Sequence, residues 1–184
     1  LGDHAKDVLQ ELPEQSAQSL ATTIDESETP NPEDVKTIIQ EVLYLIEGDC
    51  HKKGIRVIFE AEKHEHLKGN PSGLYQVIFN IAINAIEALP SGGEIKIKTQ
   101  KCQFSTKTGT DATGCQISIS DNGKGINKDT LKHIYDPFFT TKYKNTGLGL
   151  STSLNIIDQH NGTIEIETAE RIGTVFKICI PQTD

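Results

Sequence analysis

Two glycine-containing runs in this chain carry residue types that suit a nucleotide. The first holds Asp121, Gly123, Gly125 and Ile126, and the second extends from Thr146 to Ser151. Asp121 follows an alternating strand pattern, so we expect its carboxylate at a strand end, where it can accept the exocyclic amine of adenine. Asn122-Gly123 alone is an ordinary turn dipeptide, but Gly125 before an apolar residue lets backbone approach a flat ligand closely. The first run therefore predicts a base-binding loop.

The second run opens a predicted helix over about residues 147–160 and is made of Gly147, Leu148, Gly149 and Leu150. Amides in the first turn of a helix have no intrahelical partner and can point at an anion. Between the two runs lies the lid, defined here as residues 136–142. We expect Phe138 and Phe139 to anchor the lid, and Lys142 to meet phosphates as it closes. A loop with two core aromatics is the alternative.

A polar stripe follows a predicted helix over residues 71–89 and consists of Gln76, Asn80, Asn84 and Glu87. Two asparagines in mid-helix break a local rule, because their amides compete for backbone hydrogen bonds. An amide oxygen is also a neutral, hard ligand that Mg²⁺ accepts beside phosphates. From the helix alone, a magnesium site and a solvated polar face are equally good interpretations.

Composition limits the classes of function. The chain has 184 residues, 35% hydrophobic content and a net charge of -8, which allows one sizeable core and disfavours a protein that reads nucleic-acid backbones. We expect no membrane span or signal peptide in this segment, and a cytoplasmic location. Four cysteines without a C-x-x-C pair disfavour zinc and a disulfide framework. Reduced strand cysteines are expected, with Cys102 facing Cys115 across a hairpin as the alternative.

The predicted elements form an appendage and one domain. Residues 3–28 carry helical apolar stripes, and Pro30 and Pro32 then break the pattern, so residues 1–30 are interpreted as a helical linker and 31–184 as one domain. A helix capped by Asn31 should run to about Cys50. Strands are expected at 55–59, 94–104 and 115–120, and a final hairpin near Ile172-Gly173. This order favours an α+β fold with a mixed, mostly antiparallel sheet.

The motifs, taken in order, resemble the N, G1, F and G2 boxes of sensor histidine kinases. They are Asn80-x3-Asn84-Ala85, Asp121-x-Gly123-x-Gly125-Ile126, Asp136 to Lys142, and Gly147 to Ser151. Gly173 to Phe176 resembles the last nucleotide-side motif of that family. The resemblance covers roughly residues 31–181.

The resemblance implies a Bergerat ATP-binding fold, a two-layer sandwich of helices on a sheet, with ATP and Mg²⁺ held under the lid. It implies that Asn84 coordinates Mg²⁺, that Asn80 acts at the phosphates, and that Asp121 binds adenine. Thr174 would support adenine through water, and the Gly147–Leu150 amides and Lys142 would meet the phosphates. In the wider superfamily of Hsp90, MutL and gyrase B, a glutamate that activates water stands at the position of Asn80. An amide cannot act as a general base, which favours phosphoryl transfer to a protein side chain.

Two departures from the family pattern stand out. Asn145 replaces a glycine of the G2 box, and no phosphoacceptor box is found, because His64-Glu65 lies in a polar run where a loop is expected. We therefore expect a histidine kinase catalytic domain that phosphorylates a histidine outside this segment and cannot autophosphorylate alone. Its partners would be a dimerisation domain of the same protein and a response regulator. An anti-sigma-type serine kinase and a nucleotide-sensing binding module are the alternatives.

Overall fold

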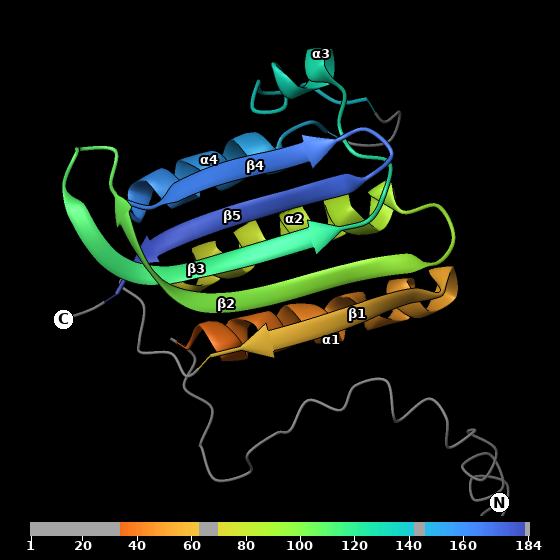
Figure 1. Cartoon of the computed structure of the whole chain (residues 1–184), viewed down its shortest axis with the longest axis horizontal. Helices are drawn as coiled ribbons and strands as arrows, with labels where there is room; N and C mark the ends of the chain where they lie inside the picture. Colours follow the sequence, from red (N-terminus) through yellow and green to blue (C-terminus); the bar gives the residue numbers. More distant parts are fainter. Residues whose placement is uncertain (1–33, 63–69, 142–145, 183–184) are drawn as a thin grey trace, which may run out of the picture.

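The fold is a five-stranded sheet with helices packed on one face (Figure 1). The computed structural model describes residues 34–62, 70–141 and 146–182. The elements, in chain order, are α1 (Val35–Lys53), β1 (Ile55–Ala61), α2 (Pro71–Ala88), β2 (Gly93–Ser105), β3 (Asp111–Asp121), α3 (Lys128–Leu131), α4 (Gly149–Gln159), β4 (Thr163–Ala169) and β5 (Gly173–Pro181).

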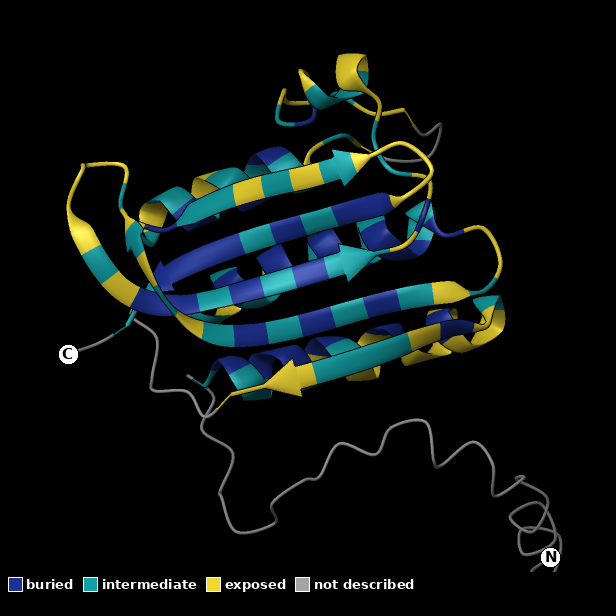
Figure 2. Cartoon of the chain, viewed as in Figure 1, coloured by how far each residue is buried: buried dark blue, intermediate teal, exposed yellow. Residues whose placement is uncertain are grey.

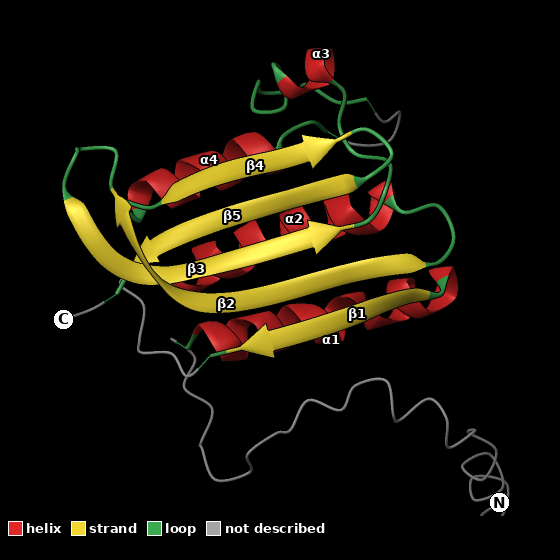
Figure 3. Cartoon of the chain, viewed as in Figure 1, coloured by secondary structure: helices red, strands yellow, loops and turns green. Residues whose placement is uncertain are grey.

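The sheet is mixed and mostly antiparallel. Its strand order is β1-β2-β3-β5-β4, with β1 and β2 parallel and every other neighbouring pair antiparallel. Helices α1, α2 and α4 lie along the same face, as Figure 3 shows. The predicted α+β fold with two layers is therefore confirmed.

The core lies between the sheet and these helices. Strand residues alternate between buried and partly exposed, which is visible as alternating colours along the strands of Figure 2. The buried positions of β2, β3 and β5 include Ile95, Ile97, Ile117, Ile119 and Ile178, each at most 1% exposed. Complete burial of such a side chain contributes about 1.5–3 kcal/mol, so this face fixes the strand register.

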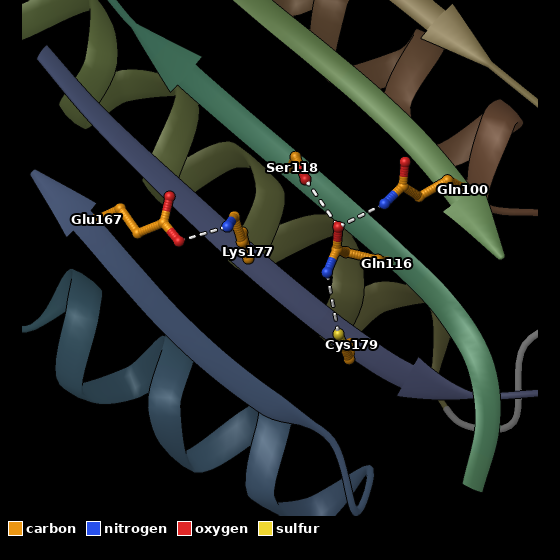
Figure 4. A network of polar contacts seen from close by, with 6 residues as sticks. All are labelled: Gln100, Gln116, Ser118, Glu167, Lys177 and Cys179. Atoms are coloured by element: carbon orange, nitrogen blue, oxygen red, sulfur yellow. Dashed lines mark hydrogen bonds and ion pairs between the residues drawn. The ribbon is translucent and has the colours of Figure 1, made fainter. Parts of the chain in front are cut away.

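The opposite face of the sheet carries polar contacts between neighbouring strands (Figure 4). The Gln116 Oε1 atom accepts hydrogen bonds from Gln100 Nε2 at 2.9 Å and Ser118 Oγ at 3.4 Å. Lys177 pairs with Glu167 across β5 and β4 at 2.5 Å. Cross-strand pairs of this kind stabilise a solvated sheet surface.

Several predicted boundaries were wrong. Helix α1 begins at Val35, with Asp34 as its N-cap accepting a hydrogen bond from the Lys36 amide; Asn31, the expected cap, lies outside the described residues. Helix α4 begins at Gly149 rather than Gly147. The short helix α3 was not predicted, although Asn127 caps it through the Thr130 amide at 2.8 Å. Side-chain caps at neighbouring polar residues compete, and tertiary packing selects among them.

The cysteines of the described residues are all free. Cys102 pairs with Gly114 and Cys115 with Lys101 in the sheet register, so the alternative in which Cys102 faces Cys115 was wrong by one position. A shift of one residue places two strand side chains on opposite faces. The proposed appendage, residues 1–30, lies outside the described residues, and none of the described helices combines the length and apolarity that a bilayer crossing requires.

Candidate nucleotide site

A cavity of about 780 Å³ opens at one end of the sheet. It lies between the second half of α2, the end of β3, the start of β5, the beginning of α4 and the loop that connects β3 to α4. The predicted site residues that line it are Asn80, Asn84, Glu87, Asp121, Gly125, Ile126, Thr146, Gly147, Gly149, Leu150 and Thr174. Of the remaining three, Gly123 and Leu148 do not line it, and Lys142 lies outside the described residues.

Helix α2 brings its polar stripe to the cavity because its other face is committed to the core. Asn70 caps the helix by accepting a hydrogen bond from the Ser72 amide at 3.0 Å, and Pro71 occupies the first turn. Residues at steps of three or four share one side of a helix, so Asn80, Asn84 and Glu87 all reach the cavity. Three of the four stripe residues therefore form a wall of the cavity, whereas Gln76 is exposed and does not line it.

The two asparagines of the stripe have different surroundings. The Asn80 Nδ2 atom donates to the Gly149 carbonyl at 3.1 Å and to Ser153 Oγ at 3.3 Å, so this amide joins α2 to the first turn of α4. Within the described part of the chain, no hydrogen bond engages the Asn84 side chain, which also lines the cavity. Asn84 thus keeps its amide oxygen available to a ligand.

Asp121 ends β3 in a fixed orientation. Its Oδ1 atom accepts a hydrogen bond from the Gly123 amide at 2.8 Å, and Thr174 is its partner in the sheet register. Burial raises the pKa of Asp121 above its ordinary value of 3.8, while backbone hydrogen bonds from Gly123 and Thr174 lower it. The outcome is a half-buried carboxyl group held at the cavity wall before any ligand binds.

Two glycines of the first run permit close backbone packing. A Cβ atom on Gly123 would lie 2.7 Å from the Ala88 carbonyl oxygen, and one on Gly125 would lie 2.1 Å from that of Ala169. Gly125 also has a φ of +66°, which side chains rarely adopt. Gly123 therefore lets the loop reach the end of α2, and Gly125 lets it reach the turn between β4 and β5.

A pair of threonines supports the same wall. The Thr168 hydroxyl accepts a hydrogen bond from the Ile126 amide at 2.9 Å and lies 3.1 Å from the Thr174 hydroxyl. Thr174 is only 4% exposed. The sequence reasoning named Thr174 and missed Thr168, because only the pairing of β4 with β5 places Thr168 opposite Thr174.

The lid differs from its prediction. Phe139 lines the cavity and contacts the His133 ring, with 5.5 Å between ring centroids, but Phe138 is 74% exposed. Ile134, just before the lid, is buried instead, at 8% exposure. The prediction of a lid anchored by both phenylalanines was therefore wrong: the φ of Phe138 is +66°, so its side chain leaves the core side of the loop.

The start of α4 faces the cavity, and the amides of its first turn have no partner within the helix. Leu148 occupies the N-cap position without a side-chain hydrogen bond to the helix, and Gly149 and Leu150 line the cavity. Gly147 has a φ of +70°, and its carbonyl accepts a hydrogen bond from the Phe138 amide at 3.1 Å. First-turn amides carry partial positive charge, so this end of the cavity favours an anion.

The sequence reasoning also missed residues on the outer wall, chiefly Lys124, Asn127, Thr130, Glu170 and Arg171. Asn127 gave a usable signal, since an asparagine followed by Asp129 in the first turn is a common helix start. Arg171 gave none: it holds a φ of +63° at the β4–β5 turn, where its amide donates to the Lys124 carbonyl at 2.7 Å. Among the described residues, no group of three or more His, Cys, Asp or Glu side chains could hold a metal.

Comparison with known proteins agrees with this geometry. Residues 69–184 match the model of the histidine kinase-, DNA gyrase B- and HSP90-like ATPase family. The sensor histidine kinase ZraS of Escherichia coli K12 is 35% identical over 149 residues, covering 80% of this chain and 30% of ZraS. The chain thus spans about a third of the length of this curated relative.

Solved structures give the same result. The nucleotide-free catalytic domain of histidine kinase ThkA superposes with a TM-score of 0.69 at 34% identity, over 81% of this chain and 93% of that domain. A complex of ThkA with the response regulator TrrA also matches, with a TM-score of 0.64 at 30% identity, over 82% of this chain and 41% of ThkA. The chain belongs to the histidine kinase-, DNA gyrase B- and HSP90-like ATPase family and, within it, is a catalytic ATP-binding domain of the sensor histidine kinase type.

Proposed function

We propose that this domain binds ATP with Mg²⁺ and donates the γ-phosphoryl group to a histidine outside this segment. The observation that supports the proposal is that the two ends of the cavity present different chemical groups. One end presents the oriented Asp121 carboxyl group with Thr174 beside it, and the other presents the start of α4. A base with an amine donor would fit the Asp121 end, and a phosphate chain would fit the start of α4.

Among the described residues, the carboxylates that line the cavity come from segments that meet at the base end. Glu87 is next to Ala88, whose carbonyl accepts a hydrogen bond from the Lys124 amide, and Glu170 is next to Arg171, which also bonds Lys124. Asn80 lines the phosphate end, and by the resemblance it stands at the position of the water-activating glutamate of the wider superfamily. An amide cannot accept that proton, so transfer to a protein side chain is favoured over hydrolysis.

The side chains present could hold Mg²⁺ only together with phosphate oxygens of the nucleotide. Asn84 lines the cavity with an amide that no described residue engages, and Mg²⁺ in phosphoryl transfer is often held by few protein groups together with phosphates and water. Bound there, the ion would neutralise charge on the transferred group. Asn84 would hold it, the first-turn amides of α4 would orient the phosphates, and Lys142 would add positive charge.

The phosphate acceptor and later partner follow by analogy with relatives. We propose a dimerisation domain of the same protein as the source of the histidine and a response regulator as the next acceptor, because ThkA was solved with such a regulator. We place the reaction in the cytoplasm, where ATP is available. Residues 1–30 would link this domain to the dimerisation domain.

Titration calorimetry and a transfer assay test the proposal together. The full chain should bind ATP, and Asn84→Ala should remove most of the gain in ATP affinity that Mg²⁺ provides while leaving the affinity measured in EDTA unchanged. With a separately supplied dimerisation domain, labelled phosphate should appear on that domain in an acid-labile form. Acid-stable phosphate would identify a serine kinase, and tight ATP binding without transfer would identify a nucleotide-sensing module.

A further inference from the structure

The side chain of His160 connects the ends of two helices that are distant in sequence. Its Nε2 atom accepts a hydrogen bond from the Asn70 backbone amide at 2.9 Å, and its Nδ1 atom lies 2.7 Å from the Ile156 carbonyl oxygen. A neutral imidazole donates through one nitrogen and accepts through the other. The Ile156 carbonyl can only accept, which assigns the proton to Nδ1; Nε2 lies closer to the Asn70 amide than to the Asn70 carbonyl oxygen, at 3.3 Å, and acts as the acceptor.

The opposing surface of α2 is shaped for this contact. Gly73 lies in the first turn of α2, and a Cβ atom there would come within 3.0 Å of Ile156 Cγ2 and 3.4 Å of His160 Cε1. A side chain at this position would press against both residues. The glycine thus brings the end of α4 close enough for His160 to reach the N-cap residue of α2.

His160 and Asn80 hold α4 at its two ends. The helices run antiparallel, since the first residues of α2 meet the end of α4 while Asn80, further along α2, meets Gly149 at its start. Helix α4 has 11 residues, and a rigid rod of this length transmits a shift at one end to the other. The Gly149 end lines the cavity, so the position of its amides depends on both contacts.

We propose that His160 is a positioning residue for the phosphate groups of the nucleotide, acting through α4 from the end remote from the cavity. This inference rests on the proposed ATP binding and adds a residue outside every motif that contacts the nucleotide. The Asp121 end of the cavity is built from β3, β5 and the loop after β3, and the hydrogen bonds that hold this loop run to Ala88, Thr168 and Arg171 rather than to α4. Loss of the His160 contact should therefore weaken binding of ATP and spare binding of adenosine.

Two substitutions at His160 separate its two hydrogen bonds. In His160→Asn the side-chain amide can still donate to Ile156, but it is too short to reach Asn70. In His160→Gln the longer side chain places an oxygen near the position of Nε2 and can accept from the Asn70 amide. We expect His160→Asn to raise the Kd of ATP about fivefold, the loss of roughly one hydrogen bond, and His160→Gln to restore most of the affinity.

The affinities of the full chain for ATP and for adenosine would be measured by NMR titration, together with the melting temperature of each variant. Lys107→Gln is the matched control, because it breaks the ion pair that joins Lys107 to Asp158 at the same end of α4. It should leave both affinities within about twofold. Gly73→Ala should also displace the end of α4 from α2, and it should weaken binding of ATP more than binding of adenosine.

Three results would overturn the inference. One is an equal loss of ATP and adenosine affinity in His160→Asn, which would assign the residue to general stability. Another is unchanged ATP affinity in both His160→Asn and Gly73→Ala. A third is an ATP-selective loss of the same size in Lys107→Gln. Failure of the unsubstituted chain to bind ATP is a separate result, because it would reject the proposed function itself.

Discussion

The two ends of the cavity are constructed in different ways. At the base end, the loop after β3 is held to three other parts of the fold: the Lys124 amide bonds Ala88, the Ile126 amide bonds Thr168, and the Lys124 carbonyl accepts from the Arg171 amide. At the phosphate end, the contacts that reach beyond the start of α4 include the Asn80 bonds to α4 and a bond between Phe138 and Gly147. The base end is part of the sheet, whereas the phosphate end depends on a helix start and a loop.

Because of this difference, we expect the two ends to contribute differently to ligand binding. Groups that are already oriented lose little entropy when a ligand arrives, whereas a loop that closes over the ligand must be ordered at that moment. We therefore expect recognition of the base to be largely preformed. The order of the phosphate end should vary with the ligand, so ATP and adenosine should respond differently to substitutions at the two ends.

The largest contrast is expected between two glycine-to-alanine substitutions. Gly125→Ala would place a Cβ atom 2.1 Å from a backbone oxygen at a φ of +66°, so it should lower the free energy of unfolding by about 2 kcal/mol or more and abolish binding of both ATP and adenosine. Gly147→Ala also meets backbone, at 2.4 Å from the Phe138 carbonyl carbon, but it strains only the lid side. It should weaken ATP about tenfold and leave adenosine nearly unchanged.

Thermal unfolding and titration with both ligands measure this contrast. If Gly147→Ala weakened adenosine as strongly as ATP, the two ends would not be independent, and the distinction between a preformed and a loop-dependent end would fail.

An intermediate effect is expected for Asp121→Asn. The variant keeps the shape of the side chain and removes its charge, so the loss should equal that of one hydrogen bond to a charged group, about 2 kcal/mol or roughly 30-fold in Kd. ATP and adenosine should lose affinity by the same factor, because both carry the same base. A loss confined to ATP would show that Asp121 acts at the phosphates instead, and calorimetry with each ligand distinguishes the two outcomes.

The smallest effect is the pH dependence that Asp121 confers. Burial raises its pKa above 3.8 in the folded chain, so the folded state binds the proton more tightly than the unfolded state. Asp121 therefore contributes stability below pH 3.8, and this contribution is lost as the pH rises through the raised pKa. Adenosine binding should show the opposite trend, because the protonated carboxyl group is a poorer acceptor for the base amine.

Comparison of the unsubstituted chain with Asp121→Asn across this pH range isolates that contribution from those of other carboxyl groups. Urea unfolding without nucleotide should give a difference in unfolding free energy that changes with pH in the stated direction. A difference independent of pH would mean that Asp121 has the same pKa in the folded and unfolded chains.

Most of the helices and strands were predictable because they depend on local sequence patterns. The stripe of α2 has helical spacing, Asn70-Pro71 marks its start, and the alternating isoleucines of β2 and β3 mark buried strands. The glycine at 125 was also a sound indicator, since its backbone conformation excludes other side chains. Failures came where two local signals competed, as at the start of α1, or where a residue adopts an unfavourable conformation, as Phe138 does.

Local patterns in the sequence predicted the described helices and strands except α3, and the residue types that border the nucleotide cavity, since periodicity, caps and glycines act over a few residues. Which of those residues touch one another follows only from the packing of the folded chain. That packing placed Thr168 beside Thr174, turned the Asn80 amide toward α4, and brought His160 to Asn70. These contacts join positions far apart in the chain, and their geometry depends on strand register and helix packing that no local pattern encodes.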